Sequence, residues 1–337
     1  MNTKRWIALV SAAVLLFFSL GLNTIMSLFK TDFFSSFESA FDVTESTVYE
    51  TPIENGAMDN RIALVSVEGT ILDVGSGSWW EEVQYNHQGF MAQLDSILND
   101  DTVKGVVLEV NSPGGGVIES AEIHEKLVQI KEQREIPIYV SMGTYAASGG
   151  YYIAAPADKI FAQKETITGS IGVIMQAINY EELAEKVGIK FETIKSGQHK
   201  DMLGGSRAST EEEKAMLQEI IDESYEDFVD VIEQGRGMTE AEVKAVADGR
   251  ILGGTQAVRA GLVDDIGKLD DTIAALRADY GLEDAQLFEY TTTNDSLGSL
   301  LGVKVSSLFG PSQEEQLMQK ILSTSNSPRM MYLYGEY

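Results

Sequence analysis

Residues 105–116, GVVLEVNSPGGG, decide the fold of this 337-residue chain. The first half of this stretch is mostly Val and Leu, which is typical of a buried strand. A turn of Asn, Ser, Pro and successive glycines comes next, and Ile123, Leu127 and Ile130 then follow at helical spacing. A strand that runs through a glycine-rich turn into a helix is typical of α/β folds with a largely parallel sheet.

The alternation of strands and helices continues on both sides of this stretch. Apolar runs such as Ile62–Val67 predict strands, and Phe90, Leu94 and Leu98 have helical spacing. We expect strands at 62–67, 105–110, 138–140 and 159–162, and helices near 88–98, 118–134, 210–232, 240–248 and 268–280. The predicted fold class is therefore α/β.

The run from Trp6 to Phe29 contains no charged residue and lies between Arg5 and Lys30. As a helix its 24 residues would extend about 36 Å, more than a hydrocarbon core of roughly 30 Å. Lys4 and Arg5 precede the run, so the positive-inside rule places the N-terminus in the cytoplasm. The alternative is a cleaved signal peptide, which has a shorter apolar centre and small residues at its cleavage site. We predict a single-pass protein of the cell membrane whose larger part is extracytoplasmic.

These features divide the chain into segments. We expect a cytoplasmic N-terminus (1–5), a transmembrane anchor (6–29), a linker (30–60), an α/β domain (61–285) and a C-terminal extension (286–337). The extension ends in an apolar, β-prone run at Met330–Tyr334. Such a run can add as a strand to a peptide-binding groove near the active site, where it would inhibit the protein or be trimmed. The alternative is an end that is merely docked or disordered.

The composition excludes several classes of protein. The chain has 25 basic and 52 acidic residues, a net charge of −27, which disfavours nucleic acid as a partner. It has no cysteine, so disulfides, thiolate metal sites and a cysteine nucleophile are excluded. A three-histidine metal site would need all 3 of its histidines. We predict neither a metal nor another cofactor.

Two glycine-rich turns carry the candidate chemistry. In the first, Gly114 and Gly115 have no Cβ, so their backbone N–H groups can face one point and stabilise an oxyanion. A plain tight turn is the alternative. In the second turn, Ala146–Gly150, Ser148 carries the hydroxyl between residues too small to block approach. A serine placed there at a helix start can act as a nucleophile, and the alternative is an N-cap serine.

A nucleophilic serine needs a base, and histidine is poorly placed for that role. Positions 149–198 contain no histidine, His124 has the pattern of a helix-surface residue, and His199 is next to Lys200. A neutral lysine is the remaining base. Spacing alone does not choose among the lysines of this region, which are Lys159, Lys164, Lys186, Lys190, Lys195 and Lys200.

The order of these motifs resembles the serine peptidases of the Clp/crotonase fold, and in particular the short, single-unit form of the signal peptide peptidase A family. The matching stretches are residues 111–115, 145–150, 168–173 and 195–201, with a further crotonase-like segment at 257–264. The resemblance implies Clp/crotonase-like repeated β-β-α units behind an N-terminal transmembrane helix. It implies Ser148 as the nucleophile and Lys200 as the base. Ser170 would orient the lysine, and Gly114 and Gly115 would donate to the oxyanion.

A lysine acts as a base only after it loses its charge. Its ordinary pKa near 10.4 keeps it protonated at pH 7, and a fall of about three units corresponds to roughly 4 kcal/mol. Burial away from carboxylates lowers the pKa of a lysine in this way. Asp201 follows Lys200 directly and would oppose the fall, so we expect its carboxylate to point away.

The resemblance implies a membrane-anchored serine endopeptidase with a Ser/Lys dyad that degrades cleaved signal peptides and other apolar peptides at the membrane. It also implies a homo-oligomer, an octamer-like ring, in which the serine and the lysine can come from neighbouring subunits. The alternatives are a catalytically minor scaffold or quality-control protein of the membrane with the same fold, and an acyl-CoA enzyme of the crotonase type. The presence of Ser148 and Lys200 disfavours the scaffold, and the apolar N-terminal run disfavours the acyl-CoA enzyme.

Overall fold

The computed structural model describes residues 47–73, 85–293 and 329–335. The chain divides into two compact units, Met1–Ser46 and Thr47–Tyr337, and every described residue belongs to the second. The predicted anchor, Trp6–Phe29, lies outside the described residues. Within the described residues, no helix combines the length and apolarity needed to cross a membrane.

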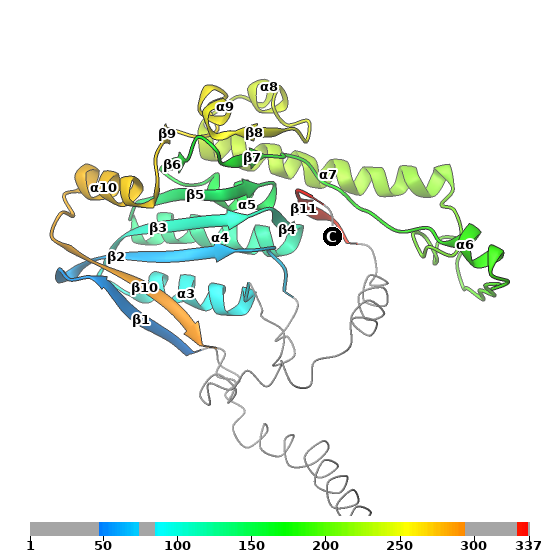
Figure 1. Cartoon of the computed structure of the whole chain (residues 1–337), viewed down its shortest axis with the longest axis horizontal. Coiled ribbons are helices and arrows are strands. Elements are labelled where there is room, and N and C mark those ends of the chain that lie inside the picture. Colours follow the sequence, from blue (N-terminus) through cyan, green and yellow to red (C-terminus); the bar gives the residue numbers. More distant parts are fainter. Residues whose placement is uncertain (1–46, 74–84, 294–328, 336–337) are drawn as a thin grey trace, which may run out of the picture. The chain divides into compact units, whose positions relative to one another are not determined.

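The second unit is built around a nine-stranded sheet (Figure 1). Its main path runs β1-β10-β2-β3-β5-β6-β9. Off this path, β7 pairs with β5, and β8 pairs with β7. The strands are β1 (Thr47–Glu54), β2 (Ala57–Glu68), β3 (Val103–Ser112), β5 (Ile138–Ala147), β6 (Lys159–Ala162), β7 (Ile167–Gly169), β8 (Ile251–Gly253), β9 (Asp265–Ile266) and β10 (Ala285–Thr293). Neighbouring strands are parallel except in the β1–β10 and β7–β8 pairs. The prediction of an α/β fold with a largely parallel sheet is confirmed.

Side chains of the central strands alternate between two apolar cores, as the period of two in a strand requires. In β2, Ala63 and Val65 face the larger core, which also contains residues of α3 (His87–Asn99) and α4 (Val117–Arg134). Ile62 and Leu64 face the other core, which is closed by α10 (Leu269–Tyr280). The sheet is therefore covered on both faces, and the edge at which the parallel strands end stays free for a site.

The C-terminal half of one long helix, α7 (Glu211–Arg236), contributes side chains to the wall of the candidate site. It begins at a capping box of Thr210 and Glu213 and ends at Gly237, whose φ is +61°. Phe228 in this half belongs to the larger core together with residues of α5 (Gly149–Ala154). The remaining short helices are α6 (Glu181–Lys186), α8 (Glu240–Lys244) and α9 (Gly254–Arg259).

Two expected boundaries differ from the structure. The sequence predicts a linker up to residue 60, whereas β1 and the start of β2 occupy residues 47–60. It also predicts a domain that ends at residue 285, whereas β10 lies between β1 and β2 in the sheet. Both differences have one cause, because β1 and β10 pair with each other across more than 230 residues of chain, from Thr47↔Thr293 onwards. No local pattern predicts a pairing of that length.

We expect β10 to be necessary for folding. A chain that ends at Asp284 lacks Leu287, Phe288 and Tyr290, all buried, and each such side chain contributes about 1.5–3 kcal/mol. The sum is comparable to the whole stability of a typical domain, about 5–15 kcal/mol. Urea unfolding followed by circular dichroism should show no cooperative transition for this chain. A chain that ends at Thr293 is the control and should unfold cooperatively; two similar transitions would contradict the role of β10.

Candidate active site

Ser148 stands between β5 and α5 in a conformation that few serines adopt. Its φ is +53° and its ψ −117°, and its backbone N–H donates to Gly169 O at 2.8 Å. The residue is 1% exposed, and its Oγ has no hydrogen-bond partner among the described residues. Ser148 occupies the N-cap position of α5, but its side chain makes no capping hydrogen bond. A strained backbone that presents an unpartnered hydroxyl is typical of a nucleophile.

Ser170 lies next to Ser148 because the strands that lead into both are paired. Ala147 and Gly169 are partners in the parallel β5–β7 ladder, so the following residues are neighbours as well. Ser170 has a φ of +50°, is 9% exposed and donates its backbone N–H to Arg250 O at 2.8 Å. The structure thus brings two of the predicted site serines together.

The first glycine turn becomes a short strand, β4 (Gly114–Gly116), beside Ser148. Ile71 holds one edge of β4, donating its N–H to Gly114 O at 2.9 Å and accepting from Gly116 N–H at 2.8 Å. A Cβ on Gly114, whose φ is +100°, would come within 2.6 Å of Gly149 N. A Cβ on Gly149 would come within 3.0 Å of Gly115 N. The absence of these Cβ atoms is what allows the two turns to meet.

One of the two predicted oxyanion donors, the N–H of Gly114, has a partner within the chain. Gly114 N–H donates to Ser112 Oγ at 3.0 Å. This hydrogen bond occupies the N–H group that the sequence analysis assigned to the oxyanion. Gly115 N lies 3.0 Å, and the Tyr332 carbonyl oxygen 3.1 Å, from the position that a Cβ on Gly149 would take. Gly149, which the sequence analysis did not single out, follows Ser148 at the start of α5, a common place for an oxyanion donor.

The C-terminal segment β11 (Met331–Leu333) lies in the site as an extended strand (Figure 1). It pairs antiparallel with β4, with Tyr332 opposite Gly115. On its other side Met331 exchanges two hydrogen bonds with Ile174, of 2.9 and 3.0 Å. Tyr334 N–H donates to Pro113 O at 2.8 Å. The segment therefore fills a groove between two backbone edges.

The carbonyl of Tyr332 points at the glycines beside Ser148. Its oxygen is 2.0 Å from the position that a Cβ on Gly114 would take, and 3.1 Å from that of a Cβ on Gly149. The oxygen thus lies against the residues that carry the candidate oxyanion donors. In this register the carbonyl that lies against Gly114 and Gly149 belongs to the Tyr332–Leu333 peptide bond.

An aromatic pocket holds the Tyr332 side chain. The ring stacks on Tyr152 of α5, with centroids 4.9 Å apart, and lies 4.7 Å from the ring of Phe228 of α7. Its hydroxyl donates to Ser224 O at 2.8 Å, and burial raises the pKa of Tyr332 above its ordinary value. The ring of His124 meets the Tyr152 ring edge to face with centroids 5.3 Å apart, and burial lowers the pKa of His124 to about 4. The pocket accepts a large aromatic side chain next to the presented bond.

Ser120 is a second hydroxyl that sequence reasoning missed. It is fully buried on α4, and its Oγ has no hydrogen-bond partner among the described residues. A Cβ on Gly149 would lie 2.6 Å from this Oγ. The hydroxyl therefore lines the space around Gly149, and no periodicity in the sequence distinguishes it from an ordinary core serine.

Lys200 lies apart from these residues. It is exposed on residues 175–210, here called the arm, which extends away from the sheet and contains α6 (Figure 1). The structure does not bring Lys200 to Ser148 within one chain, since Ser148 Oγ has no partner. Asp201 accepts from Arg207 at 2.5 Å and from Lys195 at 2.7 Å, and these bonds, Arg207 first, lower the pKa of its carboxyl. The carboxylate of Asp201 is thus paired with these two cations. Among the described residues, Lys200 forms no ion pair.

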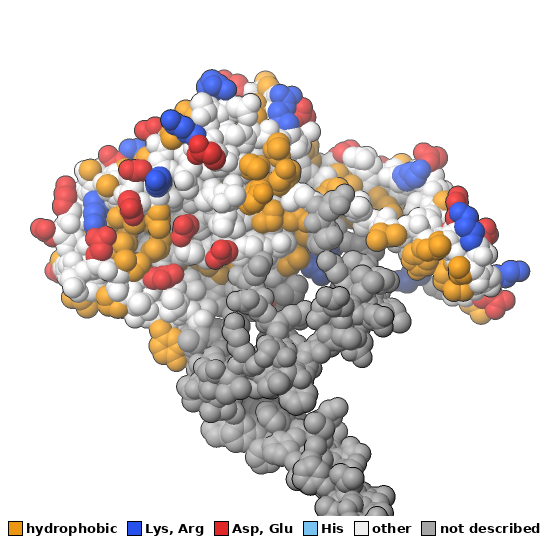
Figure 2. Space-filling model, in the orientation of Figure 1, with side chains coloured by type: hydrophobic (Ala, Val, Ile, Leu, Met, Phe, Trp, Pro, Cys, Tyr) orange, Lys and Arg blue, Asp and Glu red, His pale blue; other side chains and the backbone are white. Residues whose placement is uncertain are grey.

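The arm carries an apolar surface. Figure 2 shows hydrophobic side chains gathered on it near α6. The exposed ones are Ile178, Tyr180, Leu183, Val187, Ile189, Phe191 and Ile194. A gathering of exposed apolar side chains is typical of a surface that contacts another molecule.

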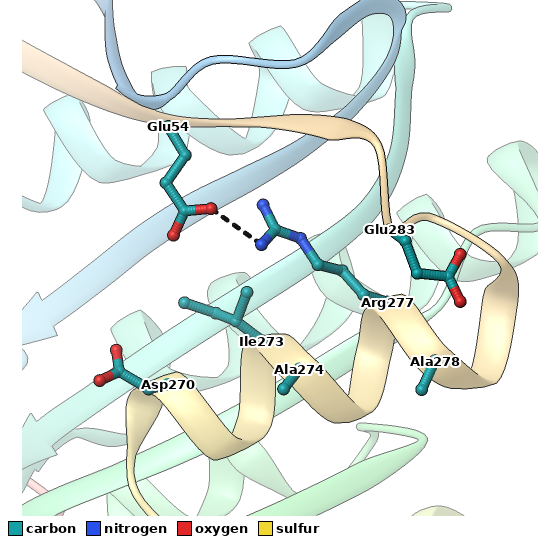
Figure 3. Close-up of a pocket in the computed structure, with 7 residues that line it drawn as sticks. All are labelled: Glu54, Asp270, Ile273, Ala274, Arg277, Ala278 and Glu283. Carbon is teal, nitrogen blue, oxygen red and sulfur yellow. Dashed lines mark ion pairs between the residues drawn. The ribbon is translucent and has the colours of Figure 1, made fainter.

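A pocket of about 310 Å³ lies elsewhere, between β1 and α10 (Figure 3). Arg277 extends across it to Glu54, with 2.8 Å between Nη1 and Oε2. Its other lining includes Asp270, Ile273 and Glu283. It contains none of the candidate site residues, and no group of three or more metal-binding side chains occurs in the described part of the chain.

This arrangement defines a class of protein. A serine at positive φ, glycine N–H groups beside it and an extended peptide segment whose carbonyl faces them are the parts of a serine peptidase.

Comparison with known proteins gives the family. The model of peptidase family S49 matches residues 130–283. The chain is 42% identical to the "Putative signal peptide peptidase SppA" of Enterococcus faecium, with 99% of both chains aligned. It is 32% identical to Protease 4 of Haemophilus influenzae, over 84% of this chain and 48% of that protein. It is 31% identical to the chloroplastic serine protease SPPA of Arabidopsis thaliana, over 74% of this chain and 37% of that protein. The chain belongs to peptidase family S49 and is a serine peptidase.

We expect Gly114→Ala to abolish most peptidase activity. Its Cβ would sit 2.0 Å from the Tyr332 carbonyl and 2.6 Å from Gly149 N, and φ of +100° strains any residue with a Cβ. Displacing the oxyanion donors should lower kcat/KM about 100-fold or more. Gly172→Ala is the matched control, because its Cβ meets nothing closer than 3.6 Å. Kinetics on a fluorogenic peptide would check this, and equal activity of the two variants would contradict it.

Proposed function

We propose that this chain is a serine endopeptidase of the Clp/crotonase type that uses a Ser148/Lys200 dyad. The observation that carries the proposal is the strand β11, whose Tyr332 carbonyl lies against Gly114 and Gly149 beside an unpartnered Ser148 hydroxyl. A peptide that binds as this strand does would present its carbonyl carbon to Ser148. Ser170, next to Ser148, supplies a second hydroxyl with which to hold an incoming amine.

Lys200 of a neighbouring copy is the proposed base. Within one chain it lies on the arm, exposed, while the Ser148 hydroxyl is left without a partner. The exposed apolar side chains of the arm favour docking on a second copy, which would bury them and carry Lys200 away from water. Repetition of such a head-to-tail contact would close a ring, and we expect an octamer-like one.

The reaction then follows as acyl transfer. Neutral Lys200 Nζ takes the proton of Ser148 Oγ as Oγ bonds to the peptide carbonyl carbon. The negative charge that develops on the carbonyl oxygen is stabilised by Gly115 N–H and Gly149 N–H. The protonated lysine returns the proton to the leaving amine as the C–N bond breaks. Water, deprotonated by the same lysine, then attacks the acyl ester and regenerates Ser148.

The proposed substrates are apolar peptides at the membrane, including cleaved signal peptides. The pocket of Tyr152 and Phe228 favours a large aromatic side chain before the cleaved bond. The similarity to a relative named as a signal peptide peptidase supports this class. An anchor at Trp6–Phe29, with the catalytic unit outside the cytoplasm, would hold the enzyme where such peptides are released.

Subunit mixing tests the dyad. Ser148→Ala and Lys200→Ala should each lower kcat by about 1000-fold or more, because each removes a group that acts in every turnover. When both variants assemble in one ring, roughly a quarter of the head-to-tail contacts regain an intact serine and lysine. Co-expressed variants should therefore recover about that share of activity, measured with an apolar fluorogenic peptide. No recovery would contradict a dyad shared between chains, and full activity of either variant alone would contradict the dyad itself.

Trimming of the protein's own tail is a second test. The register of β11 presents the Tyr332–Leu333 bond, so the wild type should lose Leu333–Tyr337 while Ser148→Ala keeps it. Intact mass spectrometry of the two proteins, purified in parallel, measures the difference. Equal masses would show that the bound tail is an inhibitor and not a substrate.

A further inference from the structure

The register of β11 fixes the position of every residue on the N-terminal side of the presented bond. Tyr332 is the first residue on the N-terminal side of that bond, so Arg329 is the fourth. This inference rests on the proposed function and refines its substrate class. The question is which groups of the enzyme meet the fourth residue.

One carboxylate, that of Glu119, faces this position. Glu119 Oε1 lies 3.7 Å from Nη1 of Arg329. The glutamate side chain is 12% exposed and the arginine side chain 48% exposed, so the pair lies at the mouth of the groove. Among the described residues, it is the ion pair that joins the segment containing β11 to the rest of the chain.

Glu119 is also held in place. Its Oε1 accepts a hydrogen bond from Asp73 N–H at 3.1 Å. A Cβ on Gly116 would lie 1.8 Å from Oε2, so the carboxylate rests directly on the backbone of β4. Glu119 lies in the first turn of the 18-residue helix α4, where the helix dipole stabilises a negative charge. Because the carboxylate is fixed at the end of the groove, it favours a cation at one defined position of the bound peptide.

We propose that Glu119 is a specificity-determining residue that favours peptides with Arg or Lys at the fourth position before the cleaved bond. The preferred sequence is then a cation, two apolar residues and an aromatic residue, as in Arg329–Tyr332. Solvent reaches half of the arginine, so the preference is modest, roughly threefold in affinity. A peptide whose basic residue lies close to an apolar run matches this pattern.

Peptides that differ only in charge test the proposal without changing the enzyme. One peptide copies residues 327–335, and its partner carries citrulline, the neutral analogue of arginine, at the position of Arg329. Binding to the full-chain Ser148→Ala protein is measured by competition, and cleavage by the wild type is measured as kcat/KM. The resident tail weakens both peptides equally and leaves their ratio unchanged. We expect the arginine peptide to be favoured roughly threefold in both measurements.

Enzyme variants locate the preference. In Glu119→Gln, which keeps an acceptor for Asp73 N–H, the ratio should fall to about one because the charge is gone. Glu132→Gln removes an exposed charge from the same helix and should keep the ratio of the wild type. Equal affinities of the two peptides for Ser148→Ala, or an unchanged ratio in Glu119→Gln, would overturn the assignment. If the peptides bind with the expected preference but no Ser148-dependent cleavage occurs, the result would support the assignment of Glu119. It would contradict the proposed function alone.

Discussion

The candidate site holds β11 as a strand, because it offers two backbone edges and a wall between them. One edge of Gly114–Gly116 is bonded to Ile71 and the other pairs with β11, and Ile174 supplies the facing edge. Residues without a Cβ line the wall, so a carbonyl of the inserted strand reaches the N–H groups beside Ser148. The backbone bonds of β11, the position of the Tyr332 carbonyl and the pocket of the Tyr332 ring all follow from this one geometry.

We propose that the tail competes with substrate through the same geometry. The backbone bonds to β4, Ile174 and Pro113 are each worth about 1 kcal/mol net, and burying the Tyr332 ring adds about 2–3 kcal/mol. A tethered segment also acts at an effective concentration near millimolar. The resident strand therefore excludes weakly bound peptides, while a peptide that also fills the cation position at Glu119 competes better. Backbone recognition accepts many sequences, and the Tyr332 pocket and Glu119 narrow that set.

Much of the fold and part of the site could be predicted from local sequence. Strands with apolar runs and helices with regular spacing were found because each pattern lies within a few residues. β1 and β10 were not, since their pairing depends on contacts far apart in the chain. Ser148 and Ser170 were found through their motifs and lie together, as paired strands require. The use of Gly114 N–H by Ser112 Oγ could not be read from spacing, because it depends on a side-chain rotamer. The exposed position of Lys200 on the arm could not be predicted either, because spacing does not choose among the lysines of this region.

The most direct test of the central claim is the rate at which a fluorophosphonate, which reacts only with an activated serine, labels Ser148. The groove geometry predicts a single adduct per chain on Ser148, located by peptide mass mapping. Removing the tail in a chain that ends at Thr293 should increase the labelling rate about tenfold, because the resident strand no longer covers the hydroxyl. Equal rates with and without the tail, or labelling at another serine, would contradict the claim that a strand seated on β4 delivers its carbonyl to Ser148.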